Sequence, residues 1–387
     1  MKAELRRAIT GYAFILPWLV ALVVFIGYPF FAAFYFSFCD FPPLLKPMFI
    51  GTENYRQLVI DPVFRRSLAV TLIYAAFAIP FGVFVALSLA LLLSARIRGQ
   101  TFYRVVFYLP HLVPSVVVAL LWMWIFNPKF GIFNVVLGLL MRVADAWTGL
   151  FFRLSADGGP LVHPAAVLLL VGPVAALLAY GPWLKTSAST RHGGFRFAAA
   201  TVLALTVLTV AFAVLCWLLP EDMRKLHSPG WLADGTSFPS VVKFAPSWAL
   251  WAIIVMGMWS VGQMAIIYLA KLQDVPVQLY EAADIDGASW WDKTRHITLP
   301  MISPVILFNV VMAIIGTFQV FTEPYIMTRG GPEDKTRFVA MFIYDQAFQY
   351  QNVGYASAVA WFLFLLIVGL TMLAFQISKR HVYYAGR

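Results

Sequence analysis

Eight apolar stretches, each long enough to cross a bilayer as a helix of about 20 residues, divide this sequence. They lie at about 11–36, 68–93, 105–126, 164–184, 197–219, 247–270, 302–323 and 355–377. Only 12% of the 387 residues are charged and 61% belong to the apolar set, whereas a soluble domain needs about 25% charged residues to cover its surface. The sequence therefore predicts an all-α integral membrane protein with about eight transmembrane helices.

Basic residues in the short connections between these stretches indicate their sidedness. One side of the predicted membrane is dense in them, at Lys2, Arg6, Arg7, Arg96, Arg98, Arg104, Lys185, Arg191, Arg196, Lys271, Lys293, Arg295, Lys379, Arg380 and Arg387. Because basic residues hold short loops in the cytoplasm, we expect both termini to be cytoplasmic. The first stretch is too long for a cleaved signal peptide and lacks a small-residue cleavage site, so we expect it to stay as a helix.

We attribute the net charge of +10 to contact with the membrane and not to binding of a nucleic acid. Basic residues that flank membrane spans meet anionic lipid head groups, so the lipid bilayer is an expected partner and nucleic acid is not. Cys39 and Cys216 lie far apart in apolar surroundings. We interpret them as small apolar side chains and expect neither a disulfide framework nor a metal site.

The connection at residues 271–300 has the local chemistry of two short helices joined by a turn. Asp274 suits the N-cap of the first helix, and Gly287 suits the left-handed position that ends it. Ser289 and Asp292 resemble a capping box at the start of the second helix. The connection is therefore predicted to form a compact helical knob outside the membrane.

Such a knob can be a docking surface or an ordinary loop. Ala282 and Ala283 are small enough for a partner to approach the helix backbone closely, Tyr280 and Ile285 offer apolar contacts, and Glu281 adds a charge. The alternative is an amphipathic loop helix whose acidic face is exposed to solvent. From the residue chemistry alone, this alternative is at least as well supported as a docking surface.

The residue sequence of this connection resembles the EAA loop of ABC importer permeases. The string Tyr280-Glu281-Ala282-Ala283-x-Ile285-Asp286-Gly287-Ala288, followed by Ile297-Thr298-Leu299-Pro300, is similar to the carbohydrate-uptake branch, which includes the maltose and glycerol-3-phosphate permeases. Flanking segments also resemble that family, namely Tyr108-Leu109-Pro110, Gly330-Gly331-Pro332 and Gly354-Tyr355-Ala356-Ser357-Ala358. The resemblance covers about residues 8–138 and 245–380.

The resemblance implies a type I ABC importer transmembrane subunit, multi-pass in a bacterial inner membrane. It implies a second homologous permease, two cytoplasmic ATPases and an extracytoplasmic solute-binding protein as partners. The ATPase-coupling residues would be Tyr280, Glu281, Ala282, Ala283, Asp286, Gly287, Leu299 and Pro300. No Walker A string occurs in the chain, so we expect a non-enzymatic subunit without a cofactor, with ATP and Mg²⁺ on the partner ATPases.

The same resemblance divides the chain into three parts. Residues 1–138 would carry the first three membrane helices, and residues 245–387 would carry the remaining core helices with the coupling loop 271–300. Residues 139–244 have no counterpart in the six-helix core and would add two membrane helices. Two added crossings preserve the sidedness of everything that follows them.

Polar side chains inside apolar spans are candidates for a solute pathway, because they are costly in lipid unless they face a cavity. Trp259, Ser260, Gln263, Asn309, Thr317, Gln319 and Phe321 are these candidates. Amides and hydroxyls can bind sugar hydroxyls and aromatic rings can cover apolar sugar faces. Hydrogen bonding between helices uses the same residue types and remains the alternative. Glu323 is interpreted as an interfacial residue.

A sugar, oligosaccharide or polyol is the expected solute. The closest alternative is an ABC permease for another solute class, such as glycerol-phosphate or an amino acid, since those families share a looser loop motif. A secondary transporter is less favoured because inverted repeats and intramembrane carboxylates are not evident. A membrane enzyme would need a clustered nucleophile, base or metal set, and the histidines are scattered.

Overall fold

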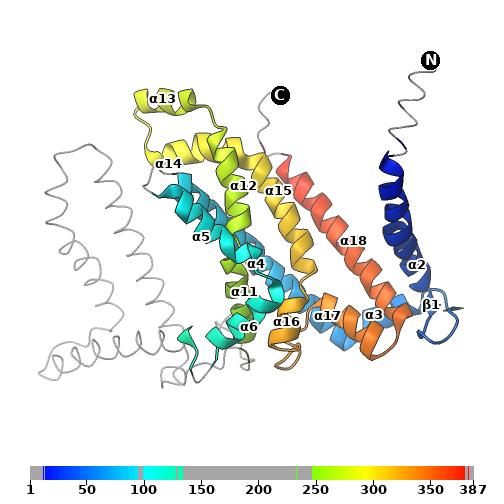
Figure 1. The fold of residues 1–387 in the computed structure, drawn as a ribbon. Helices are drawn as coiled ribbons and strands as arrows, with labels where there is room; N and C mark the ends of the chain where they lie inside the picture. Colours follow the sequence, from blue (N-terminus) through cyan, green and yellow to red (C-terminus); the bar gives the residue numbers. More distant parts are fainter. Residues whose placement is uncertain are drawn as a thin grey trace, which may run out of the picture. The chain divides into compact units, whose positions relative to one another are not determined.

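The computed structural model describes residues 12, 14–94, 99–127, 130–133, 232, 246–379 and 382. The stretches expected at 164–184 and 197–219 therefore lie outside the described residues, as does almost all of 139–244. Figure 1 shows the described part as a set of long helices joined by short connections. Their contacts below are those of the larger of two compact units, which holds residues 1–123, 231–235 and 246–387.

The described chain is helical apart from one small ribbon. Its elements are η1 (Leu22–Gly27), α2 (Tyr28–Phe36), β1 (Cys39–Asp40), β2 (Met48–Phe49), α3 (Glu53–Ile60), α4 (Pro62–Ser94), α5 (Gln100–Leu112), α6 (Ser115–Ile125), α11 (Trp248–Trp259), α12 (Gly262–Gln273), α13 (Val277–Ile285), α14 (Trp290–Lys293), η2 (Thr294–Thr298), α15 (Leu299–Phe318), α16 (Thr322–Met327), α17 (Val339–Tyr344), η3 (Asp345–Gln349) and α18 (Val353–Ser378). The η segments are π-helical. Strands β1 and β2 pair antiparallel, with Cys39 opposite Phe49.

Four described helices are long and apolar enough to cross a membrane. They run over Phe14–Phe36, Pro62–Ser94, Trp290–Met327 and Val353–Ser378. Two bent pairs meet the same criteria when each pair counts as one span: α5 with α6, bent by 99°, and α11 with α12, bent by 42°. All six coincide with stretches that the sequence predicts as membrane helices.

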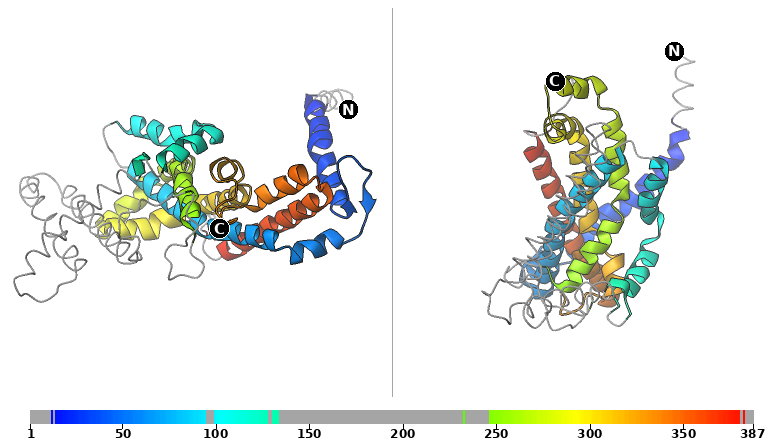
Figure 2. Two further views of the ribbon diagram at one scale, coloured as in Figure 1. Left: turned by 90° about the horizontal axis from the view of Figure 1, so that it is seen from below. Right: turned by 90° about the vertical axis from the view of Figure 1, so that its left-hand side faces the viewer.

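Helix α4 is the centre of the larger unit and contacts α11, α12, α15 and α17. Its interface with α12 uses small residues, since Ala86 and Ala90 on α4 and Ala265 on α12 are fully buried around Tyr268. In lipid, small residues allow helix backbones to approach closely and gain van der Waals contact. Figure 2 shows these helices from two further directions.

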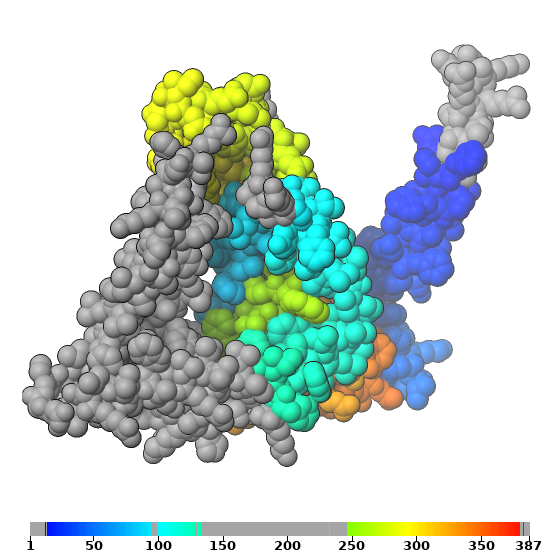
Figure 3. Space-filling view, turned by 60° about the vertical axis from the view of Figure 1, so that its left-hand side comes forward, coloured from blue at the N-terminus to red at the C-terminus, as the bar shows by residue number. Residues whose placement is uncertain are grey.

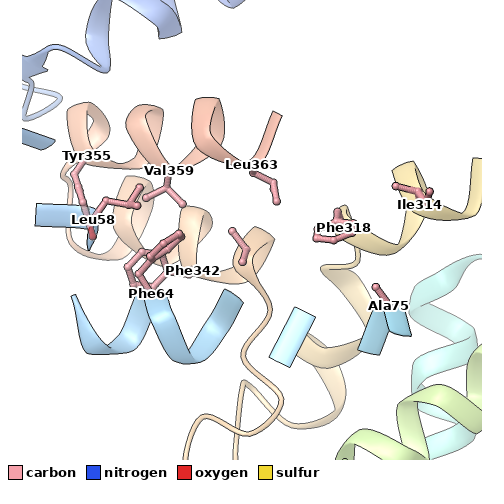
Figure 4. Close-up of a cluster of buried hydrophobic side chains, with 10 residues drawn as sticks. Leu58, Phe64, Ala75, Ile314, Phe318, Phe342, Tyr355, Val359 and Leu363 are labelled. Atoms are coloured by element: carbon pink, nitrogen blue, oxygen red, sulfur yellow. The ribbon is translucent and has the colours of Figure 1, made fainter. Parts of the chain in front are cut away.

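A second buried cluster lies where α3, α4, α15, α17 and α18 meet (Figure 4). The largest side chains in it are Phe64, Phe318, Phe342 and Tyr355, each at most 2% exposed. The Tyr355 hydroxyl donates a hydrogen bond of 2.9 Å to Oδ2 of Asp61. Oδ1 of the same carboxylate accepts the first backbone N–H groups of α4, so Tyr355 ties α18 to the start of α4.

Replacing Tyr355 with phenylalanine is expected to lower the free energy of unfolding by about 2 kcal/mol, because a partly buried hydrogen bond to a carboxylate is lost while the ring stays in place. Thermal unfolding of the purified chain in detergent measures this change. Tyr350→Phe is the matched control because its side chain is 64% exposed. Equal melting temperatures for the two variants would contradict a stabilising role for the Tyr355 hydroxyl.

Candidate functional site

The predicted knob at residues 271–300 begins differently from the expectation. Asp274 lies at the C-terminal end of α12, where its carboxylate pairs with Lys271 at 3.5 Å, and does not cap the next helix. Pro276 occupies the N-cap position of α13 with an extended ψ of 126°. The predicted capping role of Asp274 is therefore wrong, because the proline fixes the start of the helix two residues later.

The end of α13 agrees with the sequence. Gly287 has a φ of +76°, its N–H donates to the Asp284 carbonyl at 3.1 Å, and the N–H of Ala288 donates to the Ala283 carbonyl at 2.9 Å. This pair of bonds is a Schellman motif, which needs a left-handed residue after the helix. Glycine adopts that conformation without a Cβ penalty, so the sequence signal and the geometry coincide.

The second helix of the knob has the predicted capping box. The N–H of Asp292 donates to Ser289 Oγ at 3.2 Å, and the N–H of Ser289 donates to Asp292 Oδ2 at 3.0 Å. The four residues of α14 continue through η2 into α15, whose first turn holds Leu299 and Pro300. The knob is therefore joined to a membrane helix without a break.

Two side-chain contacts hold α13 against this second part. The hydroxyls of Tyr280 and Thr298 lie 2.9 Å apart, and Lys293 forms an ion pair with Asp284. Thr298 is buried and Tyr280 is half-buried. Tyr280 thus braces the knob from inside, while Leu299 and Pro300 lie half-buried at the start of α15.

The outer face of the knob is open to a partner, as its projection in Figure 3 shows in yellow. Glu281, Ala282, Asp286 and Gly287 are exposed, and Ala283 is half-buried. Large apolar side chains accompany them, with Ile285 at 87%, Trp290 at 59% and Trp291 at 60% exposure. Clustered exposed apolar side chains mark interaction surfaces. Trp290 and Trp291 are not among the predicted coupling residues, although two adjacent tryptophans in a polar connection are a visible signal.

A cavity of about 310 Å³ lies among α4, α6, α11, α12, α15 and α16. Most of its wall is apolar, and four methionines contribute to it: Met256, Met258, Met264 and Met312. Four side chains bring polar groups to the wall: Tyr74, Ser260, Thr317 and Glu323. An apolar pocket with a few convergent polar groups is the usual form of a small-molecule site.

The structure brings only two of the seven predicted pathway residues to this cavity, Ser260 and Thr317. Asn309 is buried and absent from the lining, which favours the alternative of helix-to-helix contact. Gln263 and Gln319 are exposed at other positions. Each helix therefore presents only part of its predicted polar set to the cavity.

The two aromatic candidates contact other rings. Trp259 packs edge-on against Trp122, with ring centroids 6.1 Å apart. Phe321 stacks on Tyr325 at 5.0 Å and contacts Tyr344 at 5.1 Å. Neither Trp259 nor Phe321 belongs to the cavity lining.

Glu323 and Tyr74 are cavity residues that the sequence reading did not select. Glu323 lies in the first turn of α16, just after the interruption that follows α15, and Tyr74 is a buried residue of α4. Both side chains line the same cavity. A carboxylate at the end of a long apolar stretch looks interfacial in sequence, and only the helix break turns it toward the cavity.

Charged groups near this end of the helices are mostly paired with each other. Arg337 lies 3.1 Å from Asp334 and 3.7 Å from Asp345, and Arg66 lies 3.6 Å from Asp334. Burial raises the pKa of the Asp345 carboxyl, and the Arg337 guanidinium opposes that rise. The cations of this network are therefore already matched by carboxylates.

Comparison with known proteins gives one consistent family. Residues 78–382 match the family described as the binding-protein-dependent transport system inner membrane component. The chain is 27% identical to the probable ABC transporter permease protein YesP of Bacillus subtilis, covering 98% of this chain and 93% of YesP. It is 25% identical to the trehalose/maltose transport system permease protein MalF of Thermococcus litoralis, covering 98% and 96%.

A solved structure has the same fold. It comes from a bacterial ABC transporter involved in the import of the acidic polysaccharide alginate, with a TM-score of 0.66, 18% identity and 98% of each chain covered. At this identity the likeness concerns the fold alone. Because the family match spans most of the sequence, the chain belongs to the binding-protein-dependent inner membrane components and is a multi-pass, non-catalytic permease component of an ABC transport system.

Proposed function

We propose that this permease forms the membrane pathway of a type I importer for a sugar, oligosaccharide or related polyol. Relatives named for trehalose and maltose, lactose and starch degradation products support a carbohydrate solute. A fold neighbour solved in complex with an alginate pentasaccharide-bound periplasmic protein supports delivery by an extracytoplasmic binding protein. Two of the eight proposed membrane helices would come from residues 139–244, with both termini in the cytoplasm.

The observation that carries the proposal is the helical connection between the exposed knob and the cavity. From Trp290, helix continues through η2 into α15, which contributes Thr317 to the cavity wall. A partner ATPase that binds the face around Glu281 and Gly287 would therefore act on the cavity through helical backbone. Packed helices transmit such displacements because they are not freely deformable.

ATP and Mg²⁺ would be held by the two partner ATPases, and a permease component needs no cofactor of its own. A second permease would complete the pathway. The first span, Phe14–Phe36, leaves most of its large apolar side chains exposed in the single chain. Lipid and the second permease would cover this surface, since exposed apolar patches of that size are unusual in soluble monomers.

Gentle purification from the native membrane, followed by mass spectrometry, tests the assembly. Co-purification of an ATPase and a second permease is the expected result. Recovery of the chain alone or as a homo-oligomer, with no ATPase at any stage, would overturn the importer proposal and return the secondary transporter to consideration.

Uptake by the complete complex in proteoliposomes tests the solute class. The neutral probes are maltose, trehalose, lactose and maltotriose, and the anionic probes are glycerol 3-phosphate and alginate oligosaccharides. ATP-dependent uptake of at least one carbohydrate is expected. Uptake of an amino acid without uptake of any carbohydrate probe would refute the carbohydrate assignment.

A further inference from the structure

Glu323 contributes the one carboxylate in the cavity wall formed by described residues, and that wall contains no lysine, arginine or histidine. No salt bridge or side-chain hydrogen bond joins Glu323 to another described residue, and Tyr74 lines the same cavity wall. Glu323 lies near the end of the candidate membrane span Trp290–Met327, and a charged group within such a span is costly unless a cavity, a partner or water compensates it. Glu323 thus has the placement of a group that acts on whatever enters the cavity.

We infer that Glu323 makes this cavity select neutral hydroxylated solutes and reject anionic ones. The inference rests on the proposed function, because it assigns a charge preference to the same solute pathway.

The chemistry of a carboxylate supports both halves of this preference. A carboxylate has two acceptor oxygens and no donor, so it binds sugar hydroxyls through charge-assisted hydrogen bonds. An anionic solute offers acceptors to the same group and meets a like charge. At an effective dielectric of about 20, that repulsion at contact distances is large enough to weaken binding by more than tenfold.

No cationic side chain of the described residues lines this cavity to offset the charge of Glu323. The basic groups closest in sequence to Glu323 are Arg329, Lys335 and Arg337, and none of them lines the cavity. Lys335 pairs with Glu333 at 2.8 Å and Arg337 pairs with Asp334. The solute would therefore meet the carboxylate, the Tyr74, Ser260 and Thr317 hydroxyls, and a methionine-rich wall.

Paired probes compare a neutral sugar with its acid, and the change in their affinity ratio on substitution of Glu323 separates the effect of charge from that of shape. Radiolabelled maltose and maltobionate, and lactose and lactobionate, differ in that the acid of each pair carries a carboxylate on its terminal, ring-opened unit. Equilibrium dialysis against the purified complete transporter, without the binding protein, measures their Kd values directly. In the wild type we expect each acid to bind at least tenfold more weakly than its neutral sugar.

Glu323→Gln should reduce that ratio to about threefold or less, because the amide keeps the size and an acceptor but removes the charge. Glu333→Gln is the matched control: it changes net charge equally, yet its carboxylate pairs with Lys335 outside the cavity wall, and the ammonium lowers the pKa of Glu333. The control is expected to keep the wild-type ratio. A purely structural role of Glu323 would weaken both members of a pair alike and leave the ratio unchanged.

An unchanged ratio in Glu323→Gln, or equal wild-type binding of sugar and acid, would overturn the inference. So would the absence of binding to a wild-type complex that transports the neutral sugar, since the cavity would then not hold the solute. In each of these cases ATP-dependent carbohydrate uptake would still support the proposed function. Failure of all carbohydrate uptake would instead refute the proposed function itself.

Discussion

Gly287→Val is expected to reduce ATP-dependent solute uptake by more than tenfold while the chain still inserts and folds. Gly287 has a φ of +76° and nothing lies within 4 Å of the place where a Cβ would stand, so the substitution causes no clash inside the chain. The left-handed conformation is strongly disfavoured for a β-branched residue. The end of α13 must therefore change shape, which moves the face that carries Glu281 and Asp286.

Gly51→Val is the control for this experiment, because Gly51 also has a positive φ, +66°, and nothing lies within 4 Å of its Cβ position. Gly51 lies before α3, far along the chain from the knob. Both variants carry the same kind of backbone strain, so their difference reports on location. Equal solute uptake in the two variants, together with equal amounts of ATPase that co-purify with each, would show that the knob has no special role in coupling.

Of the substitutions considered, Gly262→Val is expected to lower the free energy of unfolding most, by at least about 3 kcal/mol. Overpacking against a rigid neighbour cannot be relieved by side-chain movement. A Cβ on Gly262 would lie 1.9 Å from the carbonyl oxygen of Phe107 and 2.8 Å from its carbonyl carbon. Both neighbours are backbone atoms of α5, so α5 and α12 would have to separate. Thermal unfolding in detergent, with size-exclusion chromatography, measures the loss.

Gly369→Val provides the comparison, because nothing lies within 4 Å of a Cβ at that position in α18. It places the same side chain in a membrane helix without the clash. A Gly262→Val chain that melts within a few degrees of Gly369→Val would mean that the contact between α5 and α12 is not needed for stability.

The membrane spans could be predicted from the sequence because their signal is length and composition, which do not depend on the neighbours of a helix. The breaks within them could not be placed in the same way. The sequence predicts one helix over 247–270, where the structure has α11 and α12, separated at Ser260 and Val261. The bend of 99° between α5 and α6 falls just before Ser115, and Pro114 was its local signal.

The knob could be predicted from the sequence, whereas the cavity could not. Gly287 and the Ser289–Asp292 capping box are local chemistry, so the sequence was sufficient for them. Which way Asn309 or Thr317 faces depends on helix rotation and on packing against other helices. Glu323 reaches the cavity wall because α15 ends at Phe318 and α16 restarts four residues later, and a composition pattern contains no information on that interruption.

The unbroken run from Trp290 to Phe318 has a mechanical consequence. At a rise of about 1.5 Å per residue it is on the order of 40 Å long, which exceeds the roughly 30 Å hydrocarbon core of a bilayer. The run therefore acts as a lever arm, and the part nearest the knob is held by the contact between Tyr280 and Thr298. A tilt of about 5° at the knob would displace the far end by about 3–4 Å, a distance comparable to the diameter of a water molecule.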